Sequence, residues 1–206
     1  GSINSMGLPD LGYRAYAEMI PELTRFGKPV IASIAGLCED DFLTMARVIN
    51  QARPDLIEVN LSCPNIPGKP QIAYDPVDSE RLLKRVRPLI TVPMGVKLPP
   101  YFDPAHHAVM ADVIRRCGVD YLNLINSVGN GLVVDAKRET PVIKPKGGFG
   151  GLGGSLIKPV ALANVRAFWK LLEGRIPIIG TGGVVQGVDA FEHVLDHADG
   201  LGVNRQ

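Results

Sequence analysis

The sequence is short of cysteine and has no long apolar run. Its 206 residues include three cysteines, Cys38, Cys63 and Cys117, which are widely spaced and form no CxxC pair. An odd number of separated thiols does not suit a disulfide framework, so we expect reduced cysteines in a cytoplasmic protein. No apolar run reaches bilayer length and no charged-then-apolar leader is present. These absences predict a soluble chain that neither spans a membrane nor is secreted.

Net charge and nucleotide motifs are also lacking. Lys and Arg number 22 and Asp and Glu number 21, which gives a formal net charge of +1. Such a balance gives no broad excess of positive charge that would attract nucleic acid or an anionic membrane surface. No GxGxxG follows the first strand of a βαβ unit, and no GxxxxGK[ST] occurs. Dinucleotide and P-loop nucleotide sites are therefore poor predictions.

Predicted strands and helices alternate along most of the chain. Strands are expected at residues 30–34, 56–61, 94–98, 121–125, 176–179 and 200–203, and helices at 13–26, 39–52, 78–90, 104–117, 159–172 and 188–195. Residues 1–10 are expected as a loop and 131–154 as a long insertion. The order predicts a parallel α/β fold, and the strands look apolar throughout, as strands covered on both faces should. About six strands suit an open doubly wound sheet or part of an eight-stranded (β/α)8 barrel.

Polar residues gather where successive predicted strands end. Asn60, Ser62 and Cys63 follow one strand, Lys97 closes the next, Asn126-Ser127 follows the third, and Thr181-Gly182-Gly183 follows the fourth. The carboxyl ends of parallel strands share one rim, which is where both barrels and open α/β sheets bind ligands. The repetition at successive strands favours a binding site over coincidence.

Residues 59–70 contain the densest group of side chains that could bind a ligand or transfer a proton. The carboxamides of Asn60 and Asn65 offer donors and acceptors without charge, which suits the imide edge of a planar heterocycle. Cys63 lies between them and can give up or take a proton once its pKa is moved. The alternative is a buried structural cysteine followed by a turn. Lys97 lies inside a predicted strand, where it is either a fixed cation beside an anionic ring or oxyanion, or one partner of an interior ion pair.

Glycine-rich segments lie at residues 147–154, before a predicted helix, and at 180–183, after a predicted strand. Glycine lets backbone N–H groups approach phosphate oxygens, and the loop after the seventh strand of a barrel is a common phosphate site.

His193 and His197 are four residues apart, a spacing compatible with a metal. No third metal-binding residue accompanies His193 and His197. We therefore expect an ordinary pair of core or surface histidines and no metal site.

At these residues the sequence resembles the dihydroorotate dehydrogenases. The matching segments are Ser2–Pro9, Asn60–Pro70, Gly95–Asp103, Asn126–Gly131, Ile143–Lys146 with the glycine run after it, and Gly180–Gly183, and the resemblance extends to about Leu195. Cysteine after Ser62 resembles the class 1 enzymes, because the membrane-bound class 2 carries serine at that place. The loop from Asn4 to Pro9 resembles class 1A, the soluble branch that reduces fumarate.

The resemblance implies that dihydroorotate is oxidised to orotate in pyrimidine biosynthesis, on FMN held at the rim of an eight-stranded barrel. Cys63 would remove the C5 proton while a hydride passes from C6 to flavin N5. The expected substrate-binding residues are Asn4, Met6, Gly7, Leu8, Asn60, Asn65, Asn126 and Ser127, and the expected FMN-binding residues are Asn4, Asn60, Lys97, Ile125, Gly154, Gly182 and Gly183. Lys97 would stabilise the reduced, anionic ring, and residues 64–74 would form a lid. Fumarate is the expected acceptor, and a cytoplasmic homodimer is the expected form.

By the same resemblance, residues 1–206 form a partial FMN-binding (β/α)8 barrel domain with about six of its eight strands. The family's first two strands, with a lysine–serine pair that touches FMN, are expected to have no counterpart. One alternative is another flavin barrel acting on pyrimidines, such as the pyrimidine-reducing domain of dihydropyrimidine dehydrogenase, which would need partner domains with iron–sulfur cysteines. The other alternative is a non-catalytic barrel fragment with open sheet edges, which would be colourless and prone to aggregate.

Overall fold

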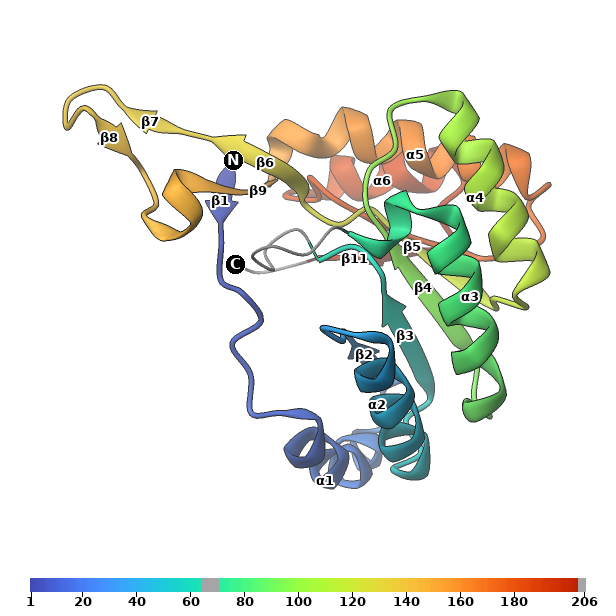
Figure 1. Ribbon diagram of the computed structural model, residues 1–206. Coiled ribbons are helices and arrows are strands. Elements are labelled where there is room, and N and C mark those ends of the chain that lie inside the picture. The colour runs from blue at the N-terminus through green and yellow to red at the C-terminus, as the bar shows by residue number, and fades with distance from the viewer. Residues whose placement is uncertain (64–70, 204–206) are drawn as a thin grey trace.

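The computed structural model describes residues 1–63 and 71–203. Its main feature is a curved six-stranded sheet with the strand order β11-β10-β5-β4-β3-β2 (Figure 1). These strands are β2 (Ile31–Ile34), β3 (Leu56–Asn60), β4 (Met94–Leu98), β5 (Tyr121–Leu124), β10 (Ile178–Thr181) and β11 (Gly200–Gly202). Each pairs in parallel with its neighbours, so their carboxyl ends share one rim. The expectation of about six parallel strands is confirmed.

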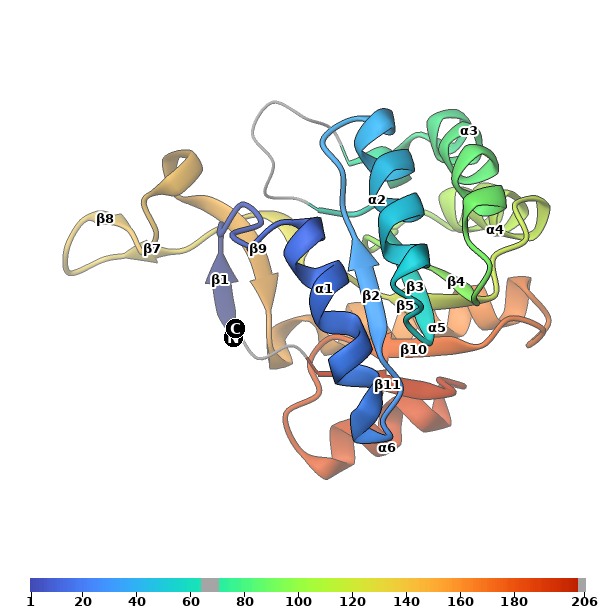
Figure 2. The same cartoon turned by 90° about the horizontal axis from the view of Figure 1, so that it is seen from below.

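Helices join these strands and cover the outer face of the sheet (Figures 1 and 2). They are α2 (Glu39–Gln51), α3 (Pro76–Val86), α4 (Pro104–Arg116), α5 (Lys158–Leu171) and α6 (Gly187–Leu195), and α1 (Tyr13–Leu23) packs beside α2. Short 3-10 helices lie at Thr24–Phe26, Ile72–Tyr74, Arg87–Leu89, Pro145–Gly148 and Ser155–Ile157. The alternation of strand and helix therefore agrees with the order predicted from the sequence.

Helices α3 and α4 both begin at an Asp-Pro pair. Asp75 accepts hydrogen bonds from the backbone N–H groups of Val77 at 2.9 Å and Asp78 at 3.0 Å. Asp103 likewise accepts one from Ala105 at 2.8 Å. Proline suits the first helical position because its missing N–H would have no helical partner there. These caps fix where the connections that follow β3 and β4 end.

The two faces of the sheet carry different residues. The helix-facing positions hold fully buried apolar side chains, namely Ile57, Val59, Met94, Val96, Leu98, Leu122 and Leu124. Several of the alternate positions of these strands hold polar residues, namely Glu58, Asn60, Lys97 and Asn123. Successive side chains of a strand point to opposite faces, so this alternation gives the sheet one apolar and one polar face. The expectation of strands that are apolar throughout is wrong, because only the outer face packs against helices.

The insertion expected at residues 131–154 contains strands, and the loop expected at 1–10 begins with one. β1 (Ser2–Asn4), β9 (Phe149–Gly153) and β6 (Val128–Leu132) form an antiparallel sheet, and β7 (Val134–Asp135) and β8 (Thr140–Pro141) form a hairpin that projects from the body (Figure 1). A Cβ at Gly150 would clash with the carbonyl oxygen of Asn4 on β1. Part of the glycine run therefore serves close strand pairing.

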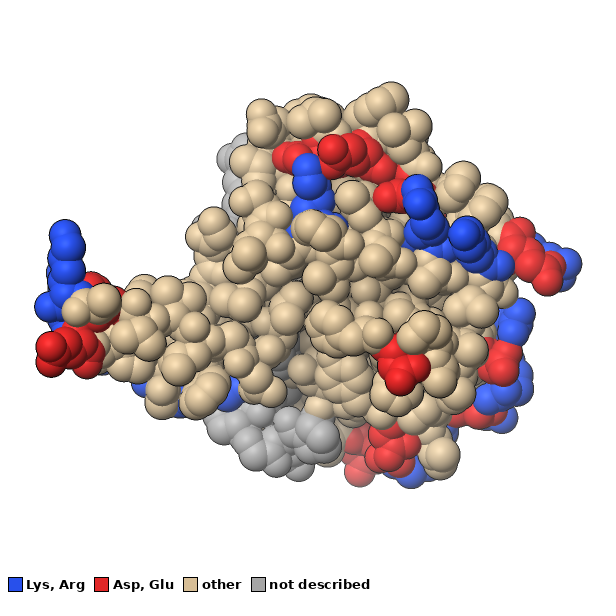
Figure 3. Space-filling model, turned by 90° about the horizontal axis from the view of Figure 1, so that it is seen from above, with Lys and Arg blue, Asp and Glu red and all other residues tan. Residues whose placement is uncertain are grey.

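Charged side chains of both signs are interspersed on the face seen in Figure 3, and more of them gather at the tip of the projecting hairpin. An ion pair on the surface links two neighbouring helices, since Glu80 on α3 lies 2.8 Å from the guanidinium group of Arg116 on α4. Across the described parts of the chain, no helix has the length and apolarity needed to cross a bilayer.

Candidate active site

A hydrogen-bonded cluster lies at the carboxyl ends of β3 and β5. Asn60, the last residue of β3, accepts hydrogen bonds through Oδ1 from the N–H of Ser62 at 3.1 Å and from its hydroxyl at 2.9 Å. Asn126, which follows β5, donates through Nδ2 to the carbonyl oxygen of Ser62 at 2.9 Å and to its Oγ at 3.0 Å. The Asn126 Oδ1 accepts from the Ser127 N–H at 2.8 Å. Ser62 is fully buried, so the cluster fixes the backbone directly before Cys63.

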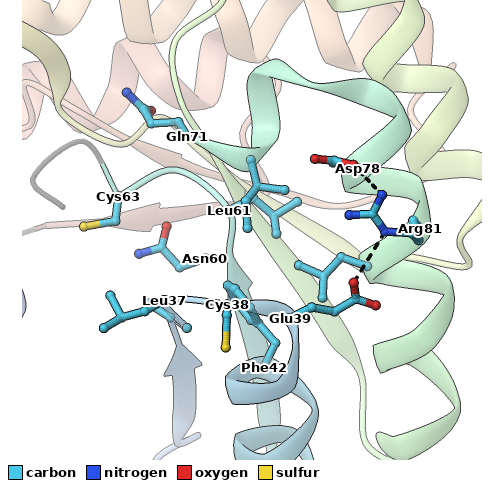
Figure 4. A pocket seen from close by; sticks show the side chains of 14 residues that line it. Leu37, Cys38, Glu39, Phe42, Asn60, Leu61, Cys63, Gln71, Asp78 and Arg81 are labelled. Atoms are coloured by element: carbon cyan, nitrogen blue, oxygen red, sulfur yellow. Dashed lines mark hydrogen bonds and ion pairs between the residues drawn. The ribbon is translucent and has the colours of Figure 1, made fainter. Parts of the chain in front are cut away.

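Cys63 lines a cavity of about 250 Å³ between the end of β3 and the first turns of α2 and α3. Figure 4 shows the side chains of Asn60 and Cys63 as neighbours at one end of this cavity. Arg81 lies at the other end, where Asp78 and Glu39 hold its guanidinium group. The Cys63 side chain is half-buried, and its sulfur has no hydrogen-bond partner among the described residues. Among the described residues, the thiol therefore lies beside the carboxamide of Asn60 on the wall of this cavity, without a hydrogen-bond partner of its own.

Lys97 lies on the inner face of β4, in register with Asn60 on β3 and Asn123 on β5. It is half-buried between two buried apolar residues of the same strand. Within residues 1–63 and 71–203, no carboxylate or hydrogen-bond acceptor pairs with its ammonium group, so the alternative of an interior ion pair finds no support there. A half-buried cation without a protein partner is suited to an anionic ligand.

A second cavity, of about 420 Å³, lies beyond the carboxyl end of β10. It brings together five of the predicted site residues, Ile125, Ser127, Gly154, Gly182 and Gly183. Gly182 and Gly183 have φ values of +124° and +76°, and a Cβ on Gly183 would lie 2.9 Å from the backbone nitrogen of Lys158 at the start of α5. At Gly154, Gly182 and Gly183 the cavity wall is therefore backbone without a side chain, which is the kind of surface that holds a phosphate group.

The remaining predicted substrate-binding residues, Asn4, Met6, Gly7, Leu8 and Asn65, are spread more widely. Asn4 is half-buried at the end of β1. Leu8 lines a separate cavity of about 340 Å³ that shares a wall with the cavity of Cys63, and Met6 is exposed. Asn65 and most of the expected lid fall within residues 64–70, which lie outside the described residues. The roles of these residues in binding stay predictions.

The sequence analysis missed a polar row beneath the rim. Ser33 donates through its hydroxyl to Glu58 Oε1 at 2.7 Å, and Asn123 donates through Nδ2 to Glu58 Oε2 at 2.7 Å. Thr181 donates through its hydroxyl to Asn123 Oδ1 at 2.6 Å. The row crosses the inner face from β2 to β10, and Glu58 is only 4% exposed. Its signal in the sequence was a polar residue inside a mostly apolar predicted strand, at Ser33, Glu58 and Asn123, whereas Thr181 lies beyond the predicted strand 176–179.

Comparisons with known proteins give one consistent result. A sequence model of the family described as dihydroorotate dehydrogenase matches residues 1–203. The chain is 50% identical over 199 residues to dihydroorotate dehydrogenase A (fumarate) of Lactococcus lactis subsp. lactis (strain IL1403), covering 95% of this chain and 64% of that protein. It is 51% identical over 199 residues to dihydroorotate dehydrogenase (fumarate) of Kluyveromyces lactis, covering 95% of this chain and 63% of that protein. The chain thus spans less than two thirds of the length of these relatives.

A solved structure gives the architecture. The crystal structure of DHODH in complex with ferulenol from Eimeria tenella matches with a TM-score of 0.80 and 18% identity, covering 98% of this chain and 61% of that chain. At this identity the likeness concerns the fold. The curved parallel sheet is therefore part of a (β/α)8 barrel, and the open doubly wound sheet is excluded.

Proposed function

The chain belongs to the dihydroorotate dehydrogenase family, and from this membership we propose that the complete protein oxidises dihydroorotate to orotate with bound FMN and fumarate as the acceptor. The observation that carries the proposal is the cluster of Asn60, Ser62 and Asn126, which fixes the backbone beside the half-buried thiol of Cys63. Fumarate is proposed as the acceptor because the relatives from Lactococcus lactis and Kluyveromyces lactis are named dihydroorotate dehydrogenase A (fumarate) and dihydroorotate dehydrogenase (fumarate). We also propose that the protein works in pyrimidine biosynthesis in the cytoplasm, as a homodimer.

In the proposed reaction, the carboxamides of Asn60 and Asn126 and the hydroxyl of Ser127 bind the polar edge of the substrate ring and orient its C5–C6 bond. The Cys63 thiolate takes the proton from C5, so the C–H bonding pair stays on the substrate and forms the C5–C6 double bond. The C6 hydrogen leaves with its own electron pair. When bound, FMN supplies the two-electron acceptor for that hydrogen.

The described residues fit FMN at its phosphate group and around its ring system. The bare backbone of Gly154, Gly182 and Gly183 in the cavity of about 420 Å³ would hold the phosphate group. Lys97, which has no partner in the described part of the chain, would hold the negative charge of the reduced ring. Ile125 is buried and would contact the isoalloxazine ring through apolar atoms. Asn4 and Asn60 would donate to its polar edge.

Replacing Cys63 tests the proposal directly. In the complete protein, Cys63→Ala should bind orotate and FMN nearly as the parent does, but reduce its flavin about 10²–10⁴-fold more slowly, because that is the usual contribution of a general base. Cys63→Ser is the matched control, since it keeps the size of the side chain but supplies a far weaker base at neutral pH. Stopped-flow bleaching of the flavin by dihydroorotate at several pH values measures the rate. A Cys63→Ala rate within a few-fold of the parent across that range would show that the thiol only packs.

The same instrument separates the alternatives. After reduction by dihydroorotate, fumarate should restore the flavin absorbance and NAD should not. Reoxidation by NAD alone would contradict the fumarate assignment. A protein that reduces its flavin with another pyrimidine but not with dihydroorotate would favour the pyrimidine-reducing flavin barrels. A colourless protein that takes up no FMN would favour a non-catalytic barrel.

A further inference from the structure

His193 lies on α6, next to the glycine loop that follows β10, and contributes nothing to the lining of the second cavity. Its side chain is fully buried, and its Nε2 lies 3.0 Å from the carbonyl oxygen of Gly182. A carbonyl oxygen only accepts hydrogen bonds, so Nε2 carries the proton and donates. In the described part of the chain, Nδ1 is buried without a partner. In the described part of the chain, His193 therefore makes its polar contact with the glycine loop.

This contact determines the direction of one peptide group. The bond between Gly182 and Gly183 is trans, so the carbonyl oxygen of Gly182 and the N–H of Gly183 point in opposite directions. Because the carbonyl points at His193, the N–H points away from it. Gly182 and Gly183 line the cavity of about 420 Å³ and His193 does not, so we infer that this N–H faces the cavity. This N–H has no hydrogen-bond partner within residues 1–63 and 71–203. Within the described part of the chain, the loop thus offers this N–H as a donor to a molecule in the cavity.

The surroundings of His193 leave its ring little freedom. A Cβ on Gly180 of β10 would lie 2.5 Å from Nδ1, so the ring packs directly against strand backbone. Helix α6 also holds the far end of the loop, because Asp189 Oδ2 accepts from the N–H groups of Val185 at 2.9 Å and Gln186 at 2.8 Å. The other oxygen of Asp189 accepts from Lys158 Nζ at 2.6 Å and joins this arrangement to α5. Helix α6 therefore holds the glycine loop at both ends.

We propose that His193 is a positioning residue, which orients the Gly182–Gly183 peptide and thereby gives the cavity its affinity for the phosphate group of FMN. The inference rests on the proposed function, because that proposal places the phosphate there. An N–H directed at a phosphate oxygen makes a charge-assisted hydrogen bond, whereas a flipped peptide would direct a carbonyl oxygen at the phosphate and repel it. Two consecutive glycines have little steric resistance to such a flip, so an external hydrogen bond is needed to select one orientation.

The test compares FMN with riboflavin, which has the same ring system but no phosphate. Flavin fluorescence gives both dissociation constants for the complete protein after removal of bound flavin. In His193→Leu, the constant for FMN should rise about tenfold or more while that for riboflavin changes little, because the loss falls on a hydrogen bond to a charged group. His193→Gln, which keeps an N–H near the position of Nε2, should restore most of the preference. His197→Leu is the matched control, because His197 stacks on Trp169 at a ring distance of 3.7 Å. In this variant, the ratio of the dissociation constants for riboflavin and FMN should equal that of the parent.

The outcomes separate this inference from the proposed function. If the parent binds riboflavin as tightly as FMN, the phosphate assignment itself is wrong. If the parent prefers FMN and His193→Leu keeps the full preference, only the positioning role is refuted. Should His193→Leu fail to fold, nitrogen NMR of labelled histidine in the unaltered protein decides. We expect the Nε2–H tautomer, with a shift on adding FMN that riboflavin does not cause, and an Nδ1–H tautomer would overturn the inference.

Discussion

Replacing Glu58 tests whether the polar row beneath the rim acts as one hydrogen-bonded unit. The direction of each bond is set by the residues, because Thr181 donates to Asn123 Oδ1, which leaves Asn123 Nδ2 to donate to Glu58. Ser33 donates to the other carboxylate oxygen. Glu58 and Thr181 are buried and Asn123 is half-buried, whereas Ser33 is exposed. Removing Glu58 should therefore leave the half-buried Asn123 with an unsatisfied N–H group. It should cost little at Ser33, because the exposed hydroxyl can hydrogen-bond to water instead.

The magnitudes follow from this geometry. Glu58→Leu leaves the Asn123 N–H without an acceptor and removes the bond to Ser33, so we expect a loss of about 3 kcal/mol in the free energy of unfolding. Glu58→Gln keeps an acceptor for Asn123, and its NH2 group can donate to the Ser33 hydroxyl. Only the charge assistance is lost, which amounts to about 1 kcal/mol.

Urea unfolding followed by circular dichroism measures the difference. With a slope of about 2 kcal/mol per molar urea, the two variants should have midpoints about 1 M apart, with Glu58→Gln the more stable. Ser33→Ala is the control for the exposed end of the row and should shift the midpoint by less than Glu58→Gln does. Equal midpoints for the leucine and glutamine variants, or a more stable leucine variant, would refute the reasoning.

Two further predictions concern charges. Lys97→Met keeps much of the side-chain length but removes the cation, so the purified protein should hold less FMN per chain and reduce it more slowly, as absorbance and stopped-flow measurements would show; an unchanged flavin content together with an unchanged rate contradicts the role. The hydrogen bond from Lys158, with those from the N–H groups of Gln186 and Val185, lowers the pKa of Asp189 from 3.8 to about 2. Because the folded-state pKa is the lower one, this contribution to stability is complete above about pH 4 and is lost as the pH falls towards 2. Denaturation midpoints between pH 2 and pH 6 should fall over that window, and less steeply in Asp189→Asn; equal pH profiles for the two proteins would exclude Asp189 as the cause.

The elements with strong local signals were predictable to within a few residues. The predicted strand 94–98 is β4 residue for residue, because a prolyl pair ends it. The predicted helix 104–117 ends one residue later than α4, and its start at Pro104 follows from the Asp103 cap. Such signals lie within a few residues of the element that they determine, so no knowledge of the tertiary structure is needed to recognise them.

The antiparallel sheet of β1, β9 and β6 was not predictable in the same way. β9 has the sequence Phe-Gly-Gly-Leu-Gly, and glycine has a low strand propensity. It forms a strand because neighbouring segments approach its backbone closely. At Gly131 of β6, for example, the side chain of Leu152 fills the place where a Cβ would lie. The sequence alone does not reveal these partners, which are distant along the chain.

The candidate site was predictable where it depends on strand ends and not where it depends on packing between layers. Asn60 and Asn126 were expected near one another because parallel strands share a rim, and both contact Ser62. His193 was expected to be an ordinary histidine. Its bond to Gly182 depends on how α6 packs against β10, and the spacing of histidines in the sequence carries no information on that.

The pairing of β1 with β9 has a consequence for the order in which the site is assembled. These strands are about 150 residues apart in the chain, and the entropy cost of closing a loop grows with its length. The parallel sheet can grow by pairing each strand with one nearer in sequence, which favours its earlier formation. We therefore expect Asn4, at the end of β1, to arrive after the cluster around Ser62 has formed. Changes in β1 should then slow a late step of folding and leave the early growth of the parallel sheet unaffected.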